Sequence, residues 1–258
     1  MKQNRSRTGP ARFPDGRVGY AVGDVHGRAD LLVRMLEKLE QEPAAREAGT
    51  QPVVLFLGDY VDRGPDSREV IDLLLSGRPE GFEKRFLKGN HEAALLAFLD
   101  DPIAHKAWLG HGGLATLAAY DVYPLPSLGA GADQIERARD DLAQRLPPAH
   151  LRFLHELERF ALLGDYLFAH AGVDPRKRLD EQGDSDLFWI RRRFIDDGRV
   201  LSHRIVHGHT PSERPYQDLR RIGVDTGAYF SNMLSAVRLS GEAAEFVSVT
   251  NGGAYAGF

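Results

Sequence analysis

The chain has no cysteine, no strong excess of charge and no apolar run long enough to span a membrane. The absence of cysteine excludes disulfide bonds, zinc–thiolate sites and thiol nucleophiles, and it fits a reducing compartment. Any metal site must therefore use His, Asp, Asn or Glu side chains. Because the formal net charge is only −4, no broad basic surface predicts a nucleic-acid partner.

The first dozen residues, MKQNRSRTGPAR, are basic but lack the apolar stretch of a secretory signal. We therefore expect a cytoplasmic protein with no membrane partner. We expect residues 1–15 to form a flexible basic N-terminus and the last eight residues, NGGAYAGF, to be loosely held. The length and composition are those of one globular domain, which we place at residues 16–250.

Short apolar runs that end in glycine or polar residues recur along the chain and predict buried strands. These runs are 18–22, 53–57, 85–88, 166–169, 204–207, 221–224 and 234–239. Between the early runs, residues 31–39 and 70–75 carry apolar side chains at helical spacing. Strands that alternate with helices predict crossover connections and a mixed α/β architecture.

The middle of the chain predicts a different kind of structure. Residues 92–160 read as helical, with a Pro/Gly-rich break at 124–131, and predict a cap region. The polar stretch 175–185 predicts a long surface loop near the site. Both segments would be candidates for setting substrate specificity.

Five polar segments lie where predicted strands run out into loops. They are GDVHG at 23–27, GDYVDRG at 58–64, GNHE at 89–92, HAG at 170–172 and HGHT at 207–210. Because loops at the carboxyl ends of strands in α/β sheets form ligand sites, we expect the side chains of these segments to converge.

Each segment alone has an ordinary structural explanation. Asp24 could cap a helix, Asp62 and Arg63 could pair on the surface, and a lone His170 or His209 is more often a hydrogen-bonded core residue. Taken together, two Asp, three His and one Asn at successive strand ends match the nitrogen and oxygen ligands of Mn, Fe or Zn. The six predicted metal ligands are Asp24, His26, Asp59, Asn90, His170 and His209.

In this order, the five segments resemble the phosphoprotein phosphatase branch of the calcineurin-like metallophosphoesterases. The resemblance covers about residues 23–210, and GVDTGAYF at 223–230 is similar to the tail of bacterial and phage-type members. It implies an α/β (α+β) metallophosphatase fold, a two-sheet β-sandwich flanked by helices with a dinuclear centre at the strand ends. Asp24 and His26 would hold one metal, and Asp59 would bridge it to a second held by the remaining three ligands. Mn is the metal that the resemblance suggests.

The same resemblance implies a mechanism in which a hydroxide that bridges the metals attacks phosphorus and His91 protonates the leaving oxygen. Asp62 would orient the His91 imidazole, and Arg63 and Asn90 would bind the phosphate. A second arginine for the phosphate would come from the FWIRRR run, where we favour Arg191. The alternative for this run is a solvated helix face.

Three other features have open interpretations. Tyr229 could line the rim of the site or belong to the core. His207 could support the ligands or have no role. The segment 108–120, with His111 and two glycines, offers no chemical role from the sequence.

Three functions follow from this pattern. The first is a serine/threonine or dual-specificity protein phosphatase, which acts on a phosphorylated protein. The alternative is a hydrolase of dinucleoside polyphosphates, such as diadenosine tetraphosphate, or of other small phosphoesters. The third is a catalytically silent scaffold, which the complete set of ligands and the presence of His91 disfavour.

Overall fold

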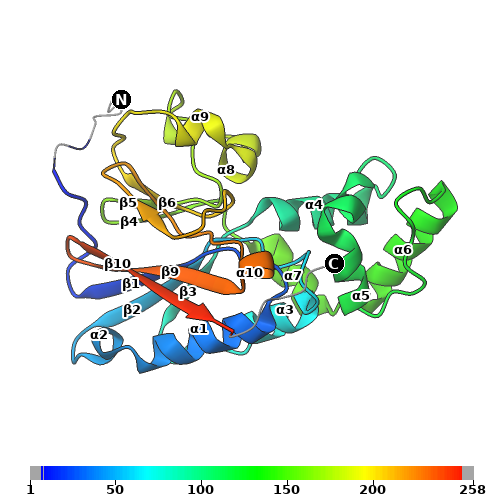
Figure 1. Ribbon diagram of the computed structural model, residues 1–258, viewed down its shortest axis with the longest axis horizontal. Coiled ribbons are helices and arrows are strands. Elements are labelled where there is room, and N and C mark those ends of the chain that lie inside the picture. The colour runs from blue at the N-terminus through cyan, green and yellow to red at the C-terminus, as the bar shows by residue number, and fades with distance from the viewer. Residues whose placement is uncertain (1–6, 8, 252–258) are drawn as a thin grey trace.

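Two five-stranded sheets lie face to face in the structure, a computed structural model that describes residues 7 and 9–251 (Figure 1). The first sheet contains β1 (Arg17–Val22), β2 (Gln51–Phe56), β3 (Glu83–Phe86), β9 (Met233–Ser240) and β10 (Ala243–Thr250). The second contains β4 (Ala161–Leu163), β5 (Tyr166–Phe168), β6 (Arg204–His207), β7 (Tyr216–Gln217) and β8 (Arg221–Gly223). The strand orders are β10-β9-β1-β2-β3 and β4-β5-β6-β8-β7.

Each sheet contains three neighbouring parallel strands, which form the centre of the second sheet and, from β1 to the edge strand β3, one side of the first. β1 pairs in parallel with β2, and β2 with β3, while β5, β6 and β8 are parallel in the second sheet. Parallel neighbours require crossovers. Helices lie in the connections from β1 to β2, from β2 to β3 and from β5 to β6, whereas the connection from β6 to β8 contains the short strand β7 and no helix. The carboxyl ends of these strands therefore lie at a common edge of the sandwich.

Both faces of the central strands are buried, which explains their nearly continuous apolar sequence. In β1, Tyr20 and Val22 pack against helices, whereas Ala21 faces the second sheet. In β5, Phe168 lies between the sheets and Leu167 faces the helices on the outer side. Because successive side chains of a strand point to opposite faces of the sheet, one core lies between the two sheets and two further cores lie beneath the helices on their outer faces.

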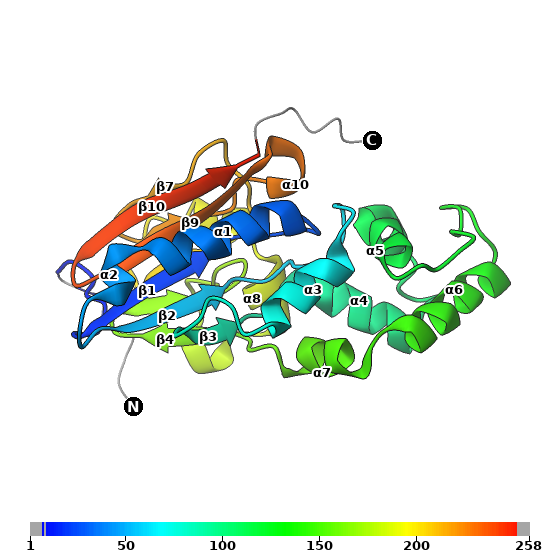
Figure 2. The same ribbon diagram turned by 90° about the horizontal axis from the view of Figure 1, so that it is seen from below.

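Helices cover both outer faces of the sandwich (Figures 1 and 2). On the first sheet lie α1 (Ala29–Gln41) and α3 (Ser67–Leu75), with the short α2 (Pro43–Arg46) after α1; on the second lie α8 (Asp184–Trp189) and α9 (Arg192–Ile195). A 3-10 turn (Leu179–Glu181) precedes α8, and α10 (Ala228–Ser231) leads into β9.

A further group, here called the cap helices, extends from one end of the sandwich (Figure 2). It contains α4 (Asn90–Asp100), a π-helical turn (Leu109–Gly113), α5 (Leu114–Ala119), α6 (Ala132–Arg145) and α7 (Pro148–Glu156). Phe98, Trp108 and Leu117 belong to the same continuous core cluster as Val22 of β1. The cap helices therefore share one apolar core with the first sheet and the helices that cover it, and are not loosely tethered.

The predicted β-sandwich flanked by helices is confirmed, and all seven predicted strands are present. Three strands were not predicted: β4, β7 and β10. β4 and β7 are only three and two residues long, too short to show a period. β10 is an edge strand in which Glu245 and Ser248 interrupt the apolar side chains, so its sequence shows no continuous apolar run.

Part of the predicted flexible N-terminus falls on residues 1–6 and 8, outside the described residues, as does 252–258 of the predicted loose C-terminus. Ala11 and Phe13, however, are buried in the core between the sheets. The Phe13 ring occupies the space that a side chain at Gly19 would fill. Within the described part of the chain, no helix is long and apolar enough to cross a membrane.

Candidate active site

Each predicted metal ligand lies just beyond the carboxyl end of a parallel strand. Asp24 and His26 follow β1, Asp59 follows β2, Asn90 follows β3, His170 follows β5 and His209 follows β6. All six are at least nine-tenths buried. The two sheets thus bring residues that are far apart in the sequence to one edge of the sandwich.

Two groups of potential ligands share Asp59. In the first, His26, Asp59 and His91 place one ligand atom each within 4.8 Å of one another, and in the second Asp59, His170 and His209 do so. Asp59 therefore lies where a bridging carboxylate would be needed. The first group contains His91 in place of the expected Asp24.

The ring of His170 has a defined orientation. Its Nδ1 atom donates to the carbonyl of Leu57 at 2.9 Å, so the neutral ring presents a lone pair at Nε2. That Nε2 lies 2.9 Å from Oδ1 of Asn90 and 3.4 Å from Oδ1 of Asp59. With the ring neutral, all of these atoms offer lone pairs and repel one another unless positive charge, a proton or a cation, lies between them. This convergence of lone-pair atoms fits the binding of a divalent cation.

The rings of His26 and His209 also present a nitrogen atom that could bind a metal. Nδ1 of His26 donates to the carbonyl of Val61 at 3.0 Å, which leaves Nε2 directed toward Oδ2 of Asp59 at 3.5 Å. The buried Nε2 atom of His209 has no hydrogen-bond partner among the described residues. A buried polar atom without a partner is costly unless a ligand satisfies it, so both rings also fit metal coordination.

Asp24 lies beside the second group. Both of its carboxylate oxygens contact the backbone N–H of His209, at 3.2 and 3.1 Å. A Cβ at Gly208 would be 2.0 Å from Oδ1 of Asp24, so only glycine allows this approach. Burial, then the charges of Asp225 and Asp59, raises the pKa of Asp24 well above its usual range.

The electrostatics of the centre favour positive charge. Burial opposes ionisation of Asp59, but the imidazoles of His170, His91 and His26 outweigh it and hold the pKa of Asp59 well below its usual range. Burial alone would lower the pKa of His170, yet the Asp59 carboxylate raises it. A buried carboxylate that attracts protons onto its neighbours would equally attract cations.

The backbone at the site is strained. Within the described residues, seven non-glycine residues have positive φ, and five of them are predicted site residues. The five are His26 (φ 47°), Asp59 (54°), Asp62 (73°), Arg63 (70°) and His209 (63°). Because positive φ is unfavourable for residues with a Cβ, the surrounding structure must hold them in place.

His91, Asp62 and Arg63 form a second set of contacts beside the ligands. Nδ1 of His91 donates to Oδ2 of Asp62 at 2.7 Å, and Nε2 lies 3.1 Å from Nη2 of Arg63 and 4.0 Å from Oδ2 of Asp59. The carboxylate of Asp62 fixes the tautomer of His91 and, together with Asp59, raises its pKa against the effect of burial. The ring therefore presents Nε2 toward the centre, where a proton can be given or taken.

The cap helices supply the partners of Asp62, a role that the sequence did not reveal. Trp108 donates through Nε1 to Oδ2 of Asp62 at 2.8 Å, and Thr116 donates through Oγ1 to Oδ1 at 2.5 Å. The backbone N–H of Asp62 donates to Oγ of Ser67, and that of Arg63 to the carbonyl of Gly112. The segment with no assigned role thus positions the His91–Asp62 pair.

Glu92 was also missed, although it stands within the GNHE segment. Its buried carboxylate accepts hydrogen bonds from the backbone N–H groups of Asp59 and Tyr60, and from that of Gly89. Burial, followed by the charge of Asp59, raises the pKa of Glu92 to about 7. The sequence feature that could have revealed this role is a Glu at the third position of a helix, where the carboxylate can accept hydrogen bonds from the free N–H groups before the helix.

Arg191 lies at the site, whereas its two neighbours are directed elsewhere. It has non-helical backbone angles between α8 and α9, and its Nη1 donates to the carbonyl of His209 at 3.1 Å. Arg193 pairs with Asp174 at 2.9 Å, and Arg192 is exposed. All three arginines are exposed, but Arg191 precedes α9, so the run does not form one continuous helix face.

Two residues with open interpretations now have positions. The Tyr229 ring lies 5.4 Å from that of His26 and 4.7 Å from Cζ of Arg63, so Tyr229 borders the site. His207 is buried, with Nε2 3.2 Å from Nη1 of Arg221, and its pKa is lowered to about 4, first by burial. His207 supports the loop that carries His209.

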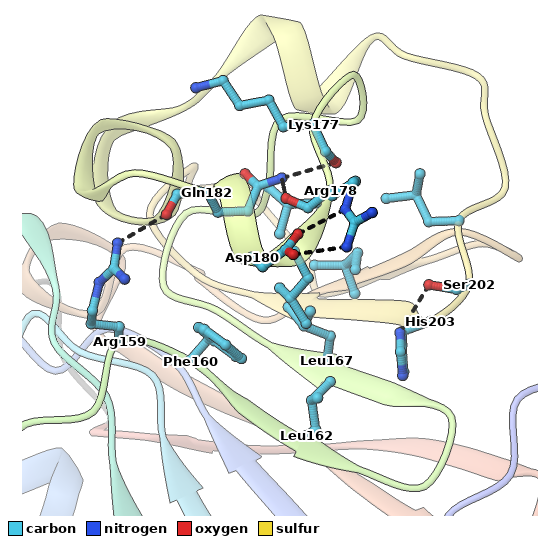
Figure 3. Close-up of a pocket in the computed structure, with 14 residues that line it drawn as sticks. Arg159, Phe160, Leu162, Leu167, Lys177, Arg178, Asp180, Gln182, Ser202 and His203 are labelled. Atoms are coloured by element: carbon cyan, nitrogen blue, oxygen red, sulfur yellow. Dashed lines mark hydrogen bonds and ion pairs between the residues drawn. The ribbon is translucent and has the colours of Figure 1, made fainter. Parts of the chain in front are cut away.

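The predicted loop at 175–185 is partly helical, because it contains the 3-10 turn and the start of α8. It borders a separate cavity on the outer side of the second sheet, with Phe160, Leu167 and His203 among its lining (Figure 3). Of the site residues described above, none lines this cavity. The expectation that this loop lies near the site stays a prediction.

Comparison with known proteins agrees with this geometry. The calcineurin-like phosphoesterase family matches residues 20–232. An asymmetrical bis(5′-nucleosyl)-tetraphosphatase of Bacillus velezensis is 30% identical over 84% of this chain and 87% of its own length. The enzymes of the same name from Oceanobacillus iheyensis and Bacillus subtilis are 30% and 27% identical, over 89% and 84% of this chain and 91% and 88% of their own lengths.

Two solved structures show the same fold. One, described as a candidate diadenosine tetraphosphatase, has a TM-score of 0.58 and 21% identity over 94% of this chain and 100% of its own. The other, a serine/threonine phosphatase from Saccharomyces cerevisiae, has a TM-score of 0.54 and 15% identity over 93% and 82%. The chain belongs to the calcineurin-like phosphoesterase family and is a hydrolytic enzyme.

Proposed function

We propose that this protein is a metal-dependent hydrolase of dinucleoside polyphosphates that cleaves them asymmetrically. The observation that carries this proposal is the match, over more than four fifths of both chains, to relatives that bear this activity in their names. The buried convergence of nitrogen and oxygen donors on Asp59 provides the reaction class. We place the activity in the cytoplasm.

The alternative stated from the sequence is thus better supported than the protein phosphatase that the motifs first favoured. Likeness to the yeast serine/threonine phosphatase is at the level of the fold, at 15% identity, and does not distinguish the substrates. A silent scaffold is disfavoured further, because the residues of the predicted site lie close together and buried.

The ligand residues fit two divalent cations. Asp24, His26 and Asp59 would hold one, and Asp59 would share the second with Asn90, His170 and His209. The donor set suits Mn, Fe or Zn, and we propose Mn. When bound, the two ions neutralise phosphoryl oxygens and lower the pKa of water.

The protein's own groups complete the chemistry. His91, oriented by Asp62, donates a proton from Nε2 to the oxygen that leaves phosphorus. Arg63 lies 3.1 Å from that nitrogen and binds the phosphate through its planar guanidinium, together with the Asn90 amide. Arg191, held by the carbonyl of His209, adds a second positive charge to the same phosphate.

Hydrolysis of two substrates by metal-reconstituted protein tests the proposal. We expect diadenosine tetraphosphate to be converted to adenosine mono- and triphosphate faster than a phosphoserine/phosphothreonine peptide is dephosphorylated. His91→Asn should lose this activity while it retains its metals, as measured by elemental analysis. Faster turnover of the peptide would return the function to protein dephosphorylation.

A further inference from the structure

A cavity of about 1250 Å³ opens directly beside the predicted phosphate clamp. Arg63 lines it, and the same side chain reaches Nε2 of His91 at 3.1 Å. Tyr229, whose ring lies 4.7 Å from Cζ of Arg63, also lines it. The cavity is therefore continuous with the place where the reacting phosphate would be held.

The walls of this cavity are apolar and aromatic. Phe230, next to Tyr229, is 54% exposed, and Tyr123 on the cap side is 60% exposed. Alanines of α5, among them Ala115 and Ala118, leave room between them. Exposed aromatic rings around a cavity are suited to stacking on a planar ring, and they are unusual on a surface that contacts only water.

The charge of the cavity fits an anionic ligand. Arg63 is a permanent cation at its edge, and no carboxylate is among the residues that line it. A volume of about 1250 Å³ also exceeds the roughly 300–1,000 Å³ of typical small-molecule sites, so a whole nucleoside can enter. A phosphorylated nucleoside would thus meet no electrostatic opposition.

We propose that this cavity binds the nucleoside attached to the phosphate that is hydrolysed, and that it thereby selects the α-phosphorus for attack. The inference rests on the proposed function and deepens it. Because Arg63 itself lines the cavity, a nucleoside that occupies the cavity carries its own 5′-phosphate, the α-phosphate, next to the guanidinium that holds the reacting phosphate. Attack at the β-phosphorus would require one more phosphate between the base and Arg63.

In this cleavage a water oxygen forms a bond to the α-phosphorus, and the bond from that phosphorus to the bridging oxygen breaks. The bridging oxygen keeps the electron pair and takes a proton from His91. One nucleoside leaves as its monophosphate and the other as its triphosphate. The water oxygen remains in the monophosphate. Of the two protons that the water loses, one returns His91 to its starting state and the other passes to solvent.

Hydrolysis of diadenosine tetraphosphate in water enriched in the heavy oxygen isotope tests the point of attack. We expect mass spectrometry to find the heavy oxygen in adenosine monophosphate. Heavy oxygen in adenosine triphosphate would mean attack at the β-phosphorus and would overturn the inference, while asymmetric cleavage itself would still stand. No cleavage of the dinucleotide, with cleavage of a phosphopeptide, would instead overturn the proposed function.

Variants of the cavity test the binding of the base without relying on turnover. In Phe230→Ala and Tyr123→Ala we expect the dissociation constant of adenosine monophosphate, measured by calorimetry, to rise about tenfold. Leu219→Ala is the matched control, because Leu219 is 72% exposed and does not line the cavity. Thermal melting checks that each variant is folded.

The binding results decide the inference on their own. If the wild-type protein does not bind adenosine monophosphate, or if both aromatic variants bind it as Leu219→Ala does, the cavity is not the nucleoside site. A rise in the dissociation constant for one aromatic variant alone would still support the cavity and would identify the ring on which the base stacks.

Discussion

The two halves of the active site differ in where their supporting residues come from. The metal half consists of the six proposed metal ligands, Asp24, His26, Asp59, Asn90, His170 and His209, which all follow strands of the sandwich. The acid half consists of His91, Asp62 and Arg63. Its hydrogen-bond partners Trp108 and Thr116 are 46 and 54 residues beyond Asp62, in the cap helices. Ligand placement is thus local to the strand ends, whereas orientation of the acid depends on a distant packing contact.

The largest effect should come from the residue that both metal groups share. Asp59→Asn removes the negative charge that holds the surrounding imidazoles, so we expect loss of most bound metal and of activity to below detection. Elemental analysis and the rise in melting temperature on adding Mn measure the loss. Retention of two metals per chain would contradict the central place given to Asp59.

Asp62→Asn should impair the acid half and leave the metal half intact. The carboxylate accepts bonds from His91, Trp108 and Thr116, and an amide has only one acceptor oxygen. We expect kcat to fall by about 10²–10⁴-fold while metal content stays that of the wild type. Loss of metal together with activity would mean that the halves are not separable.

A substitution in the cap region should affect the orientation of His91 and leave the metal ligands unchanged. Trp108→Phe keeps an aromatic ring in the core but removes the 2.8 Å bond to Asp62, a bond to a charged group worth about 1.5–3 kcal/mol. We expect kcat to fall at least about tenfold. The matched control is Trp189→Phe, because Trp189 is the only other tryptophan and is 48% exposed. Equal effects of the two changes would argue against the positioning role of Trp108.

Stability of the cap can be changed without touching the acid. Tyr120 donates to Nδ1 of His150 at 2.9 Å, and Nε2 of His150 donates to Asp72. Tyr120→Phe leaves Nδ1 buried without a donor, and we expect the free energy of unfolding to fall by about 1–3 kcal/mol. Tyr20→Phe is the control, since the buried Tyr20 hydroxyl has no partner among the described residues, and should be neutral or stabilising. Chemical denaturation compares them.

The smallest effect concerns a contact remote from both halves. Two hydrogen bonds from Arg78 to Glu40, at 2.9 and 2.7 Å, lower the pKa of Glu40 below 4.5. A lowered folded pKa stabilises the protein above the unfolded pKa, and this contribution disappears as the pH falls through the folded value. Arg78→Met should therefore cost less than about 1 kcal/mol at neutral pH, and less in acid. A cost that grows in acid would contradict this sign.

Much of the metal half could be predicted because its determinants lie next to one another in the sequence. GDVHG and GDYVDRG each follow an apolar strand and combine a turn with candidate ligands, so the end of the strand fixes where Asp24 and Asp59 lie. That the loop at 175–185 borders a separate cavity could not be predicted, because polarity and glycine content predict exposure but not which face of the molecule a loop covers.

The acid half and the substrate could be predicted only in outline. Trp108 has an apolar neighbourhood in the sequence, and nothing in that pattern shows that its indole N–H reaches Asp62. Glu92 could be recognised as a helix-start residue, yet its bonds to Asp59 and Tyr60 require the loop after β2 to fold over α4. Hydrogen bonds between distant segments have no periodicity that a sequence can display.

By itself the sequence determined the fold class, the six metal ligands and the residues of the acid half as candidates, because strand periodicity and residue chemistry are local properties. The tertiary structure decided which of these side chains face one another, which arginine of FWIRRR turns toward His209, and how an apolar cavity meets Arg63. These depend on how the cap helices pack against the sandwich, where contacts between distant segments set distance and direction.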